Sequence, residues 1–313
     1  MRTVRMDKIL ESLSLFQLRY ELVGNPANTY TTASVFAPLS NGFYFFTGDH
    51  LPEMISDSLV VVNRIPESFS KSNCYIIVQD NPQRVFYRIL DNLFSRQSNG
   101  RISTTSIIHP NARLGKNIQI DDFCVIGNCI IGDNVIIGSH CNIHDLTEIG
   151  SGTIIESHAA VGTSGVAWIW GEGELERIVQ PQLGGVKVGR NCFLGSNTIV
   201  VRGSLSEFTV IEDFTLMAPG CRIGHGTWVE SFVHFANSVV TGGNTRIGSA
   251  SFVGSAAVFR PKVAIHPNTI VGAGAVVVKN TTCSGLTLTG VPAEEKATKA
   301  NPSGMPQPKI PSS

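Results

Sequence analysis

Two histidines nine residues apart carry the strongest chemical signal in the sequence. His225 and His234 stand in the segment CRIGHGTWVESFVHFANSVVTGG, residues 221–243. An imidazole is largely unprotonated near neutral pH, so it can accept the proton of an amine or hydroxyl that attacks a carbonyl. An isolated histidine is more often a turn residue on a polar edge. The chemistry therefore depends on the element that holds the two side chains.

That element is a repeat with a period of six residues, which runs between residues 112 and 280. An aliphatic residue stands at the third place of each unit, and one unit, IIGDN, is a residue short. A helix and a lone strand have other periods, whereas a short strand plus a tight turn, repeated, fits six. Three units would form one triangular turn of a coil, with successive turns about 4.8 Å apart. The inward positions expected from residue 217 onward are Met217, Ile223, Val229, Phe235, Thr241, Ile247, Val253, Phe259, Ile265, Val271 and Val277.

The units resemble the hexapeptide repeats of the left-handed parallel β-helix acyltransferases. That resemblance implies a mainly β fold with a left-handed coil, an exception to the usual right-handed crossover. It also implies a homotrimer in which each active site lies in the cleft between two neighbouring chains.

The two-histidine segment resembles a motif of sugar N- and O-acetyltransferases of this fold, in which the second His lies in a VHIAPG-like unit. It also resembles the UDP-3-O-acylglucosamine N-acyltransferases of lipid A synthesis, whose QIAH aligns with RIGH here. Both resemblances imply that His225 is the general base, and the first implies that His234 contacts the substrate or the acyl group. The acidic neighbours that relatives carry are replaced by Gly226 and Ala218. The candidates for an orienting carboxylate are therefore Glu207, which is 18 residues before His225, together with Asp213 and Glu230.

The repeat is interrupted by a long excursion, Thr163–Gly185, which resembles the sugar-nucleotide loop of the lipid A N-acyltransferases. Trp168 and Trp170 in this loop are candidates to stack on a base or a sugar, or to pack on a neighbouring chain. Residues 1–100 resemble the uridine-binding domain of the same enzymes, with NGFYFF in place of their ITF-like strand. Phe45 or Phe46 would then stack on the base, although the tyrosine that follows in relatives is missing here. We favour the alternative that both rings fill a core.

The last repeats end in GAGAVVVKN and GVPAE, which resembles the coenzyme A end of acetyltransferases of this fold. Small residues at Gly254, Ala256, Gly272 and Ala273 would admit the pantetheine arm, and Arg260, Lys262 and Lys279 would meet its phosphates. The lipid A enzymes end instead in a long helix that engages acyl carrier protein. The sequence after Pro292 predicts no such helix, which favours a coenzyme A thioester as donor.

The first hundred residues predict a small α/β domain. Its expected helices are Met6–Leu13 and residues 82–94, the second capped by Asn81 with Pro82 at the first helical position. The expected strands are Phe43–Phe46, Leu59–Val62 and Cys74–Val78. We expect a linker over residues 95–106, the β-helix over 101–293 with its loop at 163–185, and a disordered tail over 294–313.

Composition excludes several classes of protein. The 313 residues have a formal net charge of zero, so nothing suggests binding to nucleic acid or to an anionic membrane. There is no apolar stretch long enough for a membrane span and no apolar leader, so we expect a cytoplasmic protein without membrane insertion. The seven cysteines form no CxxC pair, which indicates a reducing compartment.

A metal site is the competing interpretation for three further histidines. His140 and His158 are 18 residues apart, one turn of the coil, and His144 is near them in sequence. Left-handed β-helix carbonic anhydrases bind zinc through three histidines, but their ligand spacing is absent here. We expect stacked turn residues and no metal.

The resemblance therefore predicts an N-acyltransferase that moves an acetyl group from coenzyme A to the amine of a nucleotide-linked deoxyamino sugar, for bacterial surface glycan (O-antigen or lipopolysaccharide) synthesis. Three alternatives stay open. They are a UDP-3-O-acylglucosamine N-acyltransferase of the lipid A type, a sugar O-acetyltransferase, and a non-catalytic trimeric scaffold.

Overall fold

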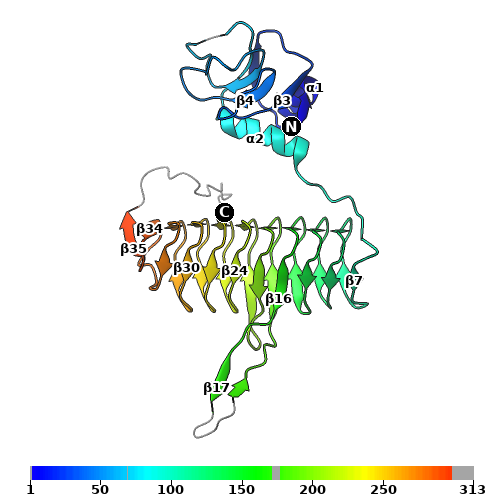
Figure 1. Ribbon diagram of the computed structural model, residues 1–313, viewed down its shortest axis with the longest axis vertical. Coiled ribbons are helices and arrows are strands. Elements are labelled where there is room, and N and C mark those ends of the chain that lie inside the picture. The colour runs from blue at the N-terminus through cyan, green and yellow to red at the C-terminus, as the bar shows by residue number, and fades with distance from the viewer. Residues whose placement is uncertain (1, 69, 171–176, 298–313) are drawn as a thin grey trace. The chain divides into compact units, whose positions relative to one another are not determined.

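The chain folds into two compact units that divide after Arg96, in a computed structural model that describes residues 2–68, 70–170 and 177–297 (Figure 1). The side chains of Trp170 and Arg177 also lie outside the described part. Neither helix of the described chain has the length and apolarity needed to cross a lipid bilayer.

The first unit is a six-stranded sheet with two helices, α1 (Met6–Leu15) and α2 (Pro82–Phe94). The strand order is β1 (Thr3–Arg5), β3 (Thr29–Thr32), β4 (Gly42–Phe45), β5 (Leu59–Val62), β6 (Cys74–Val78) and β2 (Tyr20–Val23). Strands β3 to β6 run parallel, while the two edge strands are antiparallel to their neighbours. Helix α2 packs on β4 and β5, and its first turn is capped by Asn81, whose Oδ1 accepts from the Arg84 N–H at 3.2 Å.

The second unit is a parallel β-helix whose wall consists of three sheets, here named I, II and III. Sheet I contains β7 (Ile107–Ile108), β10 (Val125–Ile126), β13 (Asn142–Ile143), β16 (Ala160–Thr163), β21 (Ile199–Val201), β24 (Arg222–Ile223), β27 (Val240–Thr241), β30 (Val258–Phe259) and β33 (Val276–Val277). Sheet II contains β8 (Arg113–Leu114), β11 (Ile130–Ile131), β14 (Thr147–Ile149), β19 (Gly185–Val188), β22 (Phe208–Ile211), β25 (Trp228–Val229), β28 (Arg246–Ile247) and β31 (Ala264–Ile265). Sheet III contains β9 (Gln119–Ile120), β12 (Ile136–Ile137), β15 (Ile154–Ile155), β20 (Phe193–Leu194), β23 (Leu216–Met217), β26 (His234–Phe235), β29 (Phe252–Val253), β32 (Ile270–Val271), β34 (Leu286–Thr289) and β35 (Glu294–Ala297).

The six-residue period sets the interior of this coil. All eleven inward positions expected from Met217 to Val277 are buried, with exposed fractions between 0% and 4%. At the edges between sheets the chain must turn with a positive φ, which Asn and Gly adopt at little cost. Asn117, Asn134 and Asn191 stand at such positions, with φ between 50° and 57°. The predicted coil is therefore confirmed, including its short unit, since β11 follows β10 by five residues.

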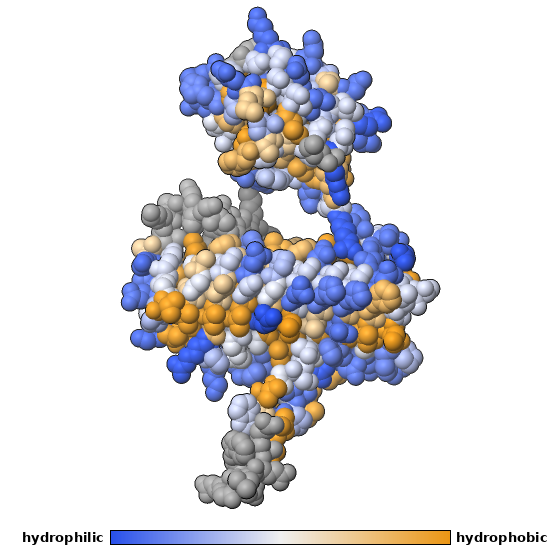
Figure 2. Space-filling view, in the orientation of Figure 1, coloured by the Kyte–Doolittle hydropathy of each residue, from blue (hydrophilic) through white to orange (hydrophobic). Residues whose placement is uncertain are grey.

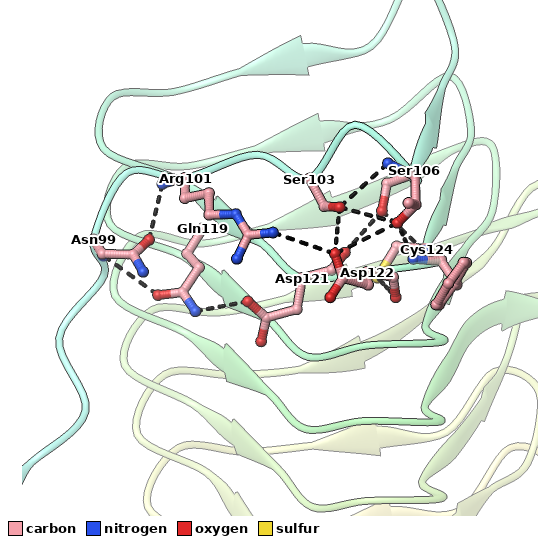
Figure 3. Close-up of polar contacts among 10 residues, drawn as sticks. Asn99, Arg101, Ser103, Ser106, Gln119, Asp121, Asp122 and Cys124 are labelled. Atoms are coloured by element: carbon pink, nitrogen blue, oxygen red, sulfur yellow. Dashed lines mark hydrogen bonds and ion pairs between the residues drawn. The ribbon is translucent and has the colours of Figure 1, made fainter.

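The coil begins earlier than the repeat predicts. Strand β7 precedes the first predicted unit, and a bridge between Ile102 and Ile120 lies within the expected linker. A polar network covers the end of the coil here (Figure 3). Asp122 accepts a hydrogen bond from Ser103 and pairs with Arg101 at 3.4 Å, and Gln119 donates to Asp121 at 2.7 Å. This network covers the polar edge that the first turn would otherwise expose.

The excursion within 163–185 is a hairpin that projects from the coil, with β17 (Trp168–Trp170) antiparallel to β18 (Arg177–Val179) (Figure 1). The expected tail is wrong at its start, because residues 294–297 form β35, which pairs antiparallel with β34. Backbone hydrogen bonds to β34 hold residues 294–297 in a regular strand. The remainder of the predicted tail, 298–313, lies outside the described residues.

Candidate active site

His225, Glu207 and the three predicted donor cations lie along one edge of the coil, between sheets I and II. The register of sheet I pairs Val200, Ile223, Thr241, Phe259 and Val277 in succession. The second residues after these paired positions are Arg202, His225, Gly243, Pro261 and Lys279. They form a column with one residue per turn of the coil. We call this edge the I–II edge.

His225 is held by the turn before it in the column. Its Nδ1 lies 3.0 Å from the Oγ of Ser204. The Glu207 carboxylate in turn accepts the backbone N–H groups of Ser204 at 2.8 Å and of Leu205 at 2.9 Å. These hydrogen bonds, first that from the Leu205 N–H, lower the pKa of Glu207 below its ordinary 4.5. Glu207 therefore orders the turn that carries Ser204, and Ser204 fixes the imidazole.

The sequence predicts Glu207 as an orienting carboxylate for His225, and in the structure Ser204 stands between the carboxylate and the imidazole. The carboxylate acts on His225 through the Ser204 turn, so it is a positioning residue. If Nδ1 donates to the Ser204 oxygen, Nε2 is left with its lone pair. That is the tautomer that a general base needs.

The Nε2 side of the His225 ring packs against Gly243, one turn further along the column. A Cβ on Gly243 would lie 2.3 Å from His225 Nε2 and 2.6 Å from Cε1. Glycine at this position therefore leaves room for the imidazole ring itself. Gly226, which replaces the acid expected after His225, has a φ of +64° and forms the turn.

The other two carboxylate candidates lie on a different edge, between sheets II and III. Asp213 pairs with Arg190 at 3.0 Å and accepts its backbone N–H at 2.7 Å. Glu230 accepts from the Ser249 N–H at 2.8 Å. A hollow of about 540 Å³ over sheet II includes Asp213 but no histidine. Neither carboxylate can orient His225, because each follows a sheet II strand and His225 precedes one.

His234 is not beside His225 within one chain. It lies in β26 of sheet III, the side of the triangular coil that is opposite the I–II edge. Its ring meets Phe252 edge-on at a centroid distance of 5.2 Å, and burial lowers its pKa. A nine-residue separation spans one and a half units of six, which places the two side chains on different parts of the coil.

The hairpin joins the same I–II edge as His225. Its returning leg bonds to the Ser204 turn, with the Leu183 N–H donating to Ser204 O at 2.8 Å and the Gly184 N–H to Gly203 O at 3.1 Å. Trp168 on the outgoing leg is 53% exposed. Trp170 has its backbone in β17, and its side chain lies outside the described part. The proposed stacking role of both rings stays a prediction.

The residues expected to bind the donor divide between two edges. Arg260, Lys262 and Lys279 are exposed on the I–II edge beyond His225, and no carboxylate within the described ranges pairs with them. The small residues lie instead on the edge between sheets III and I; these are Gly254, Ala256, Gly272 and Ala273. A single chain therefore does not bring the two predicted groups together.

The two phenylalanines predicted to stack on a base pack inside the first unit. The Phe45 ring lies 5.4 Å from Phe86 and 5.7 Å from Tyr87 of α2, centroid to centroid. Phe46 packs on the opposite face of the sheet, in a cluster that includes Tyr44. A separate hollow of about 430 Å³ lies beyond the ends of β5 and β6. Neither phenylalanine lines it; its lining residues are Arg19, Tyr20, Glu21, Asn63, Ile77, Val78 and Gln79.

The histidines considered as metal ligands lie on two different edges. Phe123, His140 and His158 stack on the edge between sheets III and I, with centroids 5.1 Å and 5.0 Å apart. His144 lies on the I–II edge, near Arg202, and burial followed by that guanidinium lowers its pKa. His140 precedes strand β13 of sheet I and His144 follows it, so the strand separates the two histidines onto different edges.

Sequence reasoning missed Ser204, Arg202 and Gly243. The period of six offered a signal for them, because each follows a sheet I strand as His225 does. The irregular unit TIVVRGSLSE hid this correspondence, since its turn is longer than the others.

Comparisons with known proteins agree with the coil. Residues 111–145 match the family described as bacterial transferase hexapeptide (six repeats). A UDP-3-O-acylglucosamine N-acyltransferase from Coxiella burnetii (strain Dugway 5J108-111) is 30% identical over 200 residues, which cover 53% of this chain and 56% of the relative. The corresponding enzyme from Acinetobacter baylyi is 28% identical, over 58% of this chain and 56% of its own length. The chain thus spans about half the length of the curated relatives it matches.

Solved structures show the same fold. A UDP-N-acetylglucosamine acyltransferase is 22% identical with a TM-score of 0.57, over 62% of this chain and 73% of its own. The Bacteroides fragilis protein of that description has a TM-score of 0.55 at 21% identity, over 63% and 74%. The repeats, the three parallel sheets and these matches together show that the second unit has the left-handed parallel β-helix fold, built from hexapeptide repeats.

Proposed function

We propose that this protein transfers an acyl group from a phosphopantetheine thioester to a sugar that is linked to a nucleotide. The single observation that carries the proposal is the His225–Ser204–Glu207 arrangement on the I–II edge. The activities of the matched relatives support an amine of a UDP-linked acylglucosamine as acceptor. These activities support the alternative of a lipid A-type N-acyltransferase better than acetyl transfer to a deoxyamino sugar.

In the proposed reaction His225 is the general base. Its Nε2 takes a proton from the sugar amine as the nitrogen attacks the thioester carbonyl, and Ser204 Oγ accepts the Nδ1–H. The tetrahedral intermediate then expels the thiolate as the new amide forms. The imidazolium returns its proton to that sulfur, so the enzyme ends the cycle unchanged. No covalent enzyme intermediate is required.

The basic side chains beyond His225 supply a second part of the proposal. Arg260, Lys262 and Lys279 are exposed on the side of His225 that faces away from the hairpin. Phosphate groups occur both in coenzyme A and at the base of the phosphopantetheine arm of an acyl carrier protein. A carrier protein adds an acidic surface, which the same cations would attract. Either donor therefore fits the charges on this edge.

A homotrimer would complete this site. Val125 and Val258 on sheet I and Leu216 on sheet III are 46%, 38% and 45% exposed. Figure 2 shows apolar side chains gathered in a band along the coil. Covering such surface favours association. A neighbour that placed its sheet III against the I–II edge would bring the partner's His234 toward His225.

The test is a matrix of two donors and several acceptors, read by the appearance of free thiol. Acetyl-coenzyme A and a 3-hydroxyacyl carrier protein are each offered UDP-3-O-acylglucosamine, UDP-N-acetylglucosamine, and dTDP- and GDP-linked amino sugars. Thiol release with a nucleotide sugar, and a product carrying the acyl group by mass spectrometry, supports the proposal. Absence of turnover in every combination, together with no thioester binding by calorimetry, would leave the non-catalytic scaffold.

A further inference from the structure

The Arg202 guanidinium lies on the I–II edge, one turn of the coil from His225. It is fixed at the root of the hairpin, by which we mean the part of the edge where the hairpin leaves and rejoins the coil. The guanidinium of Arg202 donates from Nε to the Gly162 carbonyl at 2.7 Å and from Nη2 to the Asp145 carbonyl at 3.0 Å. An arginine has five N–H donors, so about three of them remain for another partner. Two carbonyl contacts therefore fix the plane of this group without neutralising its charge.

The neighbouring carboxylate does not pair with this arginine. Asp145 meets Arg202 through its backbone carbonyl, while its Oδ1 accepts the Asn128 N–H at 2.7 Å, on the preceding turn of the coil. His144 lies beside the guanidinium, and burial, followed by the charge of Arg202, lowers the pKa of its imidazole. Gly162 lies beside His144 on the next turn of the coil, and a Cβ there would lie 3.1 Å from His144 Cβ. The cluster therefore presents one unpaired cation and, beside it, one imidazole.

A second observation at the same root indicates a missing partner. Gln182, on the returning leg of the hairpin, is only 8% exposed. Its Oε1 accepts the Gly165 N–H at 2.7 Å, but its Nε2 has no hydrogen-bond partner within the described parts of the chain. A buried N–H without a partner is destabilising. An acceptor oxygen supplied by a ligand at this root would remove that cost.

We propose that Arg202 and His144 bind the diphosphate that joins the sugar to the nucleoside in the acceptor. This inference rests on the proposed function and extends it to the acceptor side of the same edge. A planar guanidinium matches two phosphate oxygens at once, and this geometry fixes both position and direction. His144 donates one N–H to a further phosphate oxygen.

The spacing along the coil agrees with this arrangement. Arg202 is one turn before His225 in the column, and its side chain reaches back over the turn of Gly162. Successive turns are about 4.8 Å apart, so a phosphate held there lies roughly 5–10 Å from the base. That distance is comparable with the width of one sugar ring. The donor cations Arg260, Lys262 and Lys279 lie on the other side of His225, so the two substrates approach the base from opposite directions.

Calorimetric titration with UDP tests the subsite without requiring turnover, with uridine and inorganic pyrophosphate as companion probes. We expect Arg202→Lys and His144→Gln each to weaken UDP binding by about tenfold or more, which is the loss of one charge-assisted contact. Uridine binding should change little. Arg190→Lys is the matched control, since its guanidinium also holds fixed partners but lies on the II–III edge.

Arg202 also fixes the hairpin root, so its variant needs a check of folding by thermal midpoint. His144→Gln removes no tie to the hairpin and keeps the test decisive if Arg202→Lys is unstable. Unchanged UDP affinity in both variants, or no UDP binding by the wild type, would overturn the subsite. Transferase turnover with intact affinity in the variants would reject the subsite alone, whereas variant-dependent UDP binding without turnover would reject only the proposed function.

Discussion

Replacing Ser204 with alanine removes the one hydroxyl that contacts His225 Nδ1, at 3.0 Å. When His225 takes a proton from the acceptor it becomes an imidazolium, and the lost contact is then a hydrogen bond to a charged group. Such bonds contribute about 1.5–3 kcal/mol. Because about 1.4 kcal/mol corresponds to a tenfold change in rate, kcat should fall roughly 10- to 150-fold. KM should change little, since Ser204 acts on the base and not on a substrate.

The assay is steady-state thiol release with the active donor and acceptor pair. Ser206→Ala is the matched control, because Ser206 is exposed in the same turn and makes no hydrogen bond among the described residues. Its kcat should stay within twofold of the wild type, and Ser204→Thr, which keeps a hydroxyl, should retain more activity than Ser204→Ala. If Ser204→Ala were as fast as the wild type, the argument that Ser204 sets the tautomer of His225 would be refuted.

Three other changes follow from the same geometry. Gly243→Ala places a Cβ 2.3 Å from His225 Nε2, so the ring must move. We expect kcat to fall at least tenfold with little loss of thermal stability. Unchanged kcat would show that the base does not face Gly243. Phe259→Ala empties a core position that is 1% exposed, and denaturation should show a loss of about 3–5 kcal/mol; a loss below 1 kcal/mol would mean that the core does not depend on this ring. Glu207 has a lowered pKa in the fold, so its stabilisation of the Ser204 turn is complete above about pH 4.5 and is lost as pH falls through the folded pKa. Hydrogen exchange at the Ser204 and Leu205 amides should accelerate over that acid range, and constant protection would contradict the role of Glu207.

The coil was predictable because its physics is periodic. One inward side chain recurs every six residues, and each is buried, from Met217 to Val277. The turn positions with positive φ recur with the same period, although Phe, His, Leu, Ser, Ala and Lys occupy some of them beside Asn and Gly. The early strands of the first unit were not predictable, because β1 and β3 are short, lie at or near the sheet edge and lack a clear apolar alternation.

The site was predictable in part. His225 lies on an edge with Glu207, as a separation of 18 residues suggests, but the hydroxyl between them depends on an irregular turn that the period does not describe. His234 shows the opposite case, since a nine-residue spacing within one motif separates the two rings across the coil. Phe45 and Phe46 show a third case, in which tertiary packing against α2 and a second cluster occupies rings that were candidates for a ligand.

The most direct test of the central claim is the kcat of His225→Ala in the thiol-release assay, with His158→Ala as the matched control on another edge of the coil. General bases typically contribute about 10²–10⁴-fold. We predict a fall of that size for His225→Ala, with donor binding by calorimetry retained, and a kcat within twofold of the wild type for His158→Ala. Full turnover in His225→Ala would contradict the assignment of the base and with it the mechanism proposed for this edge.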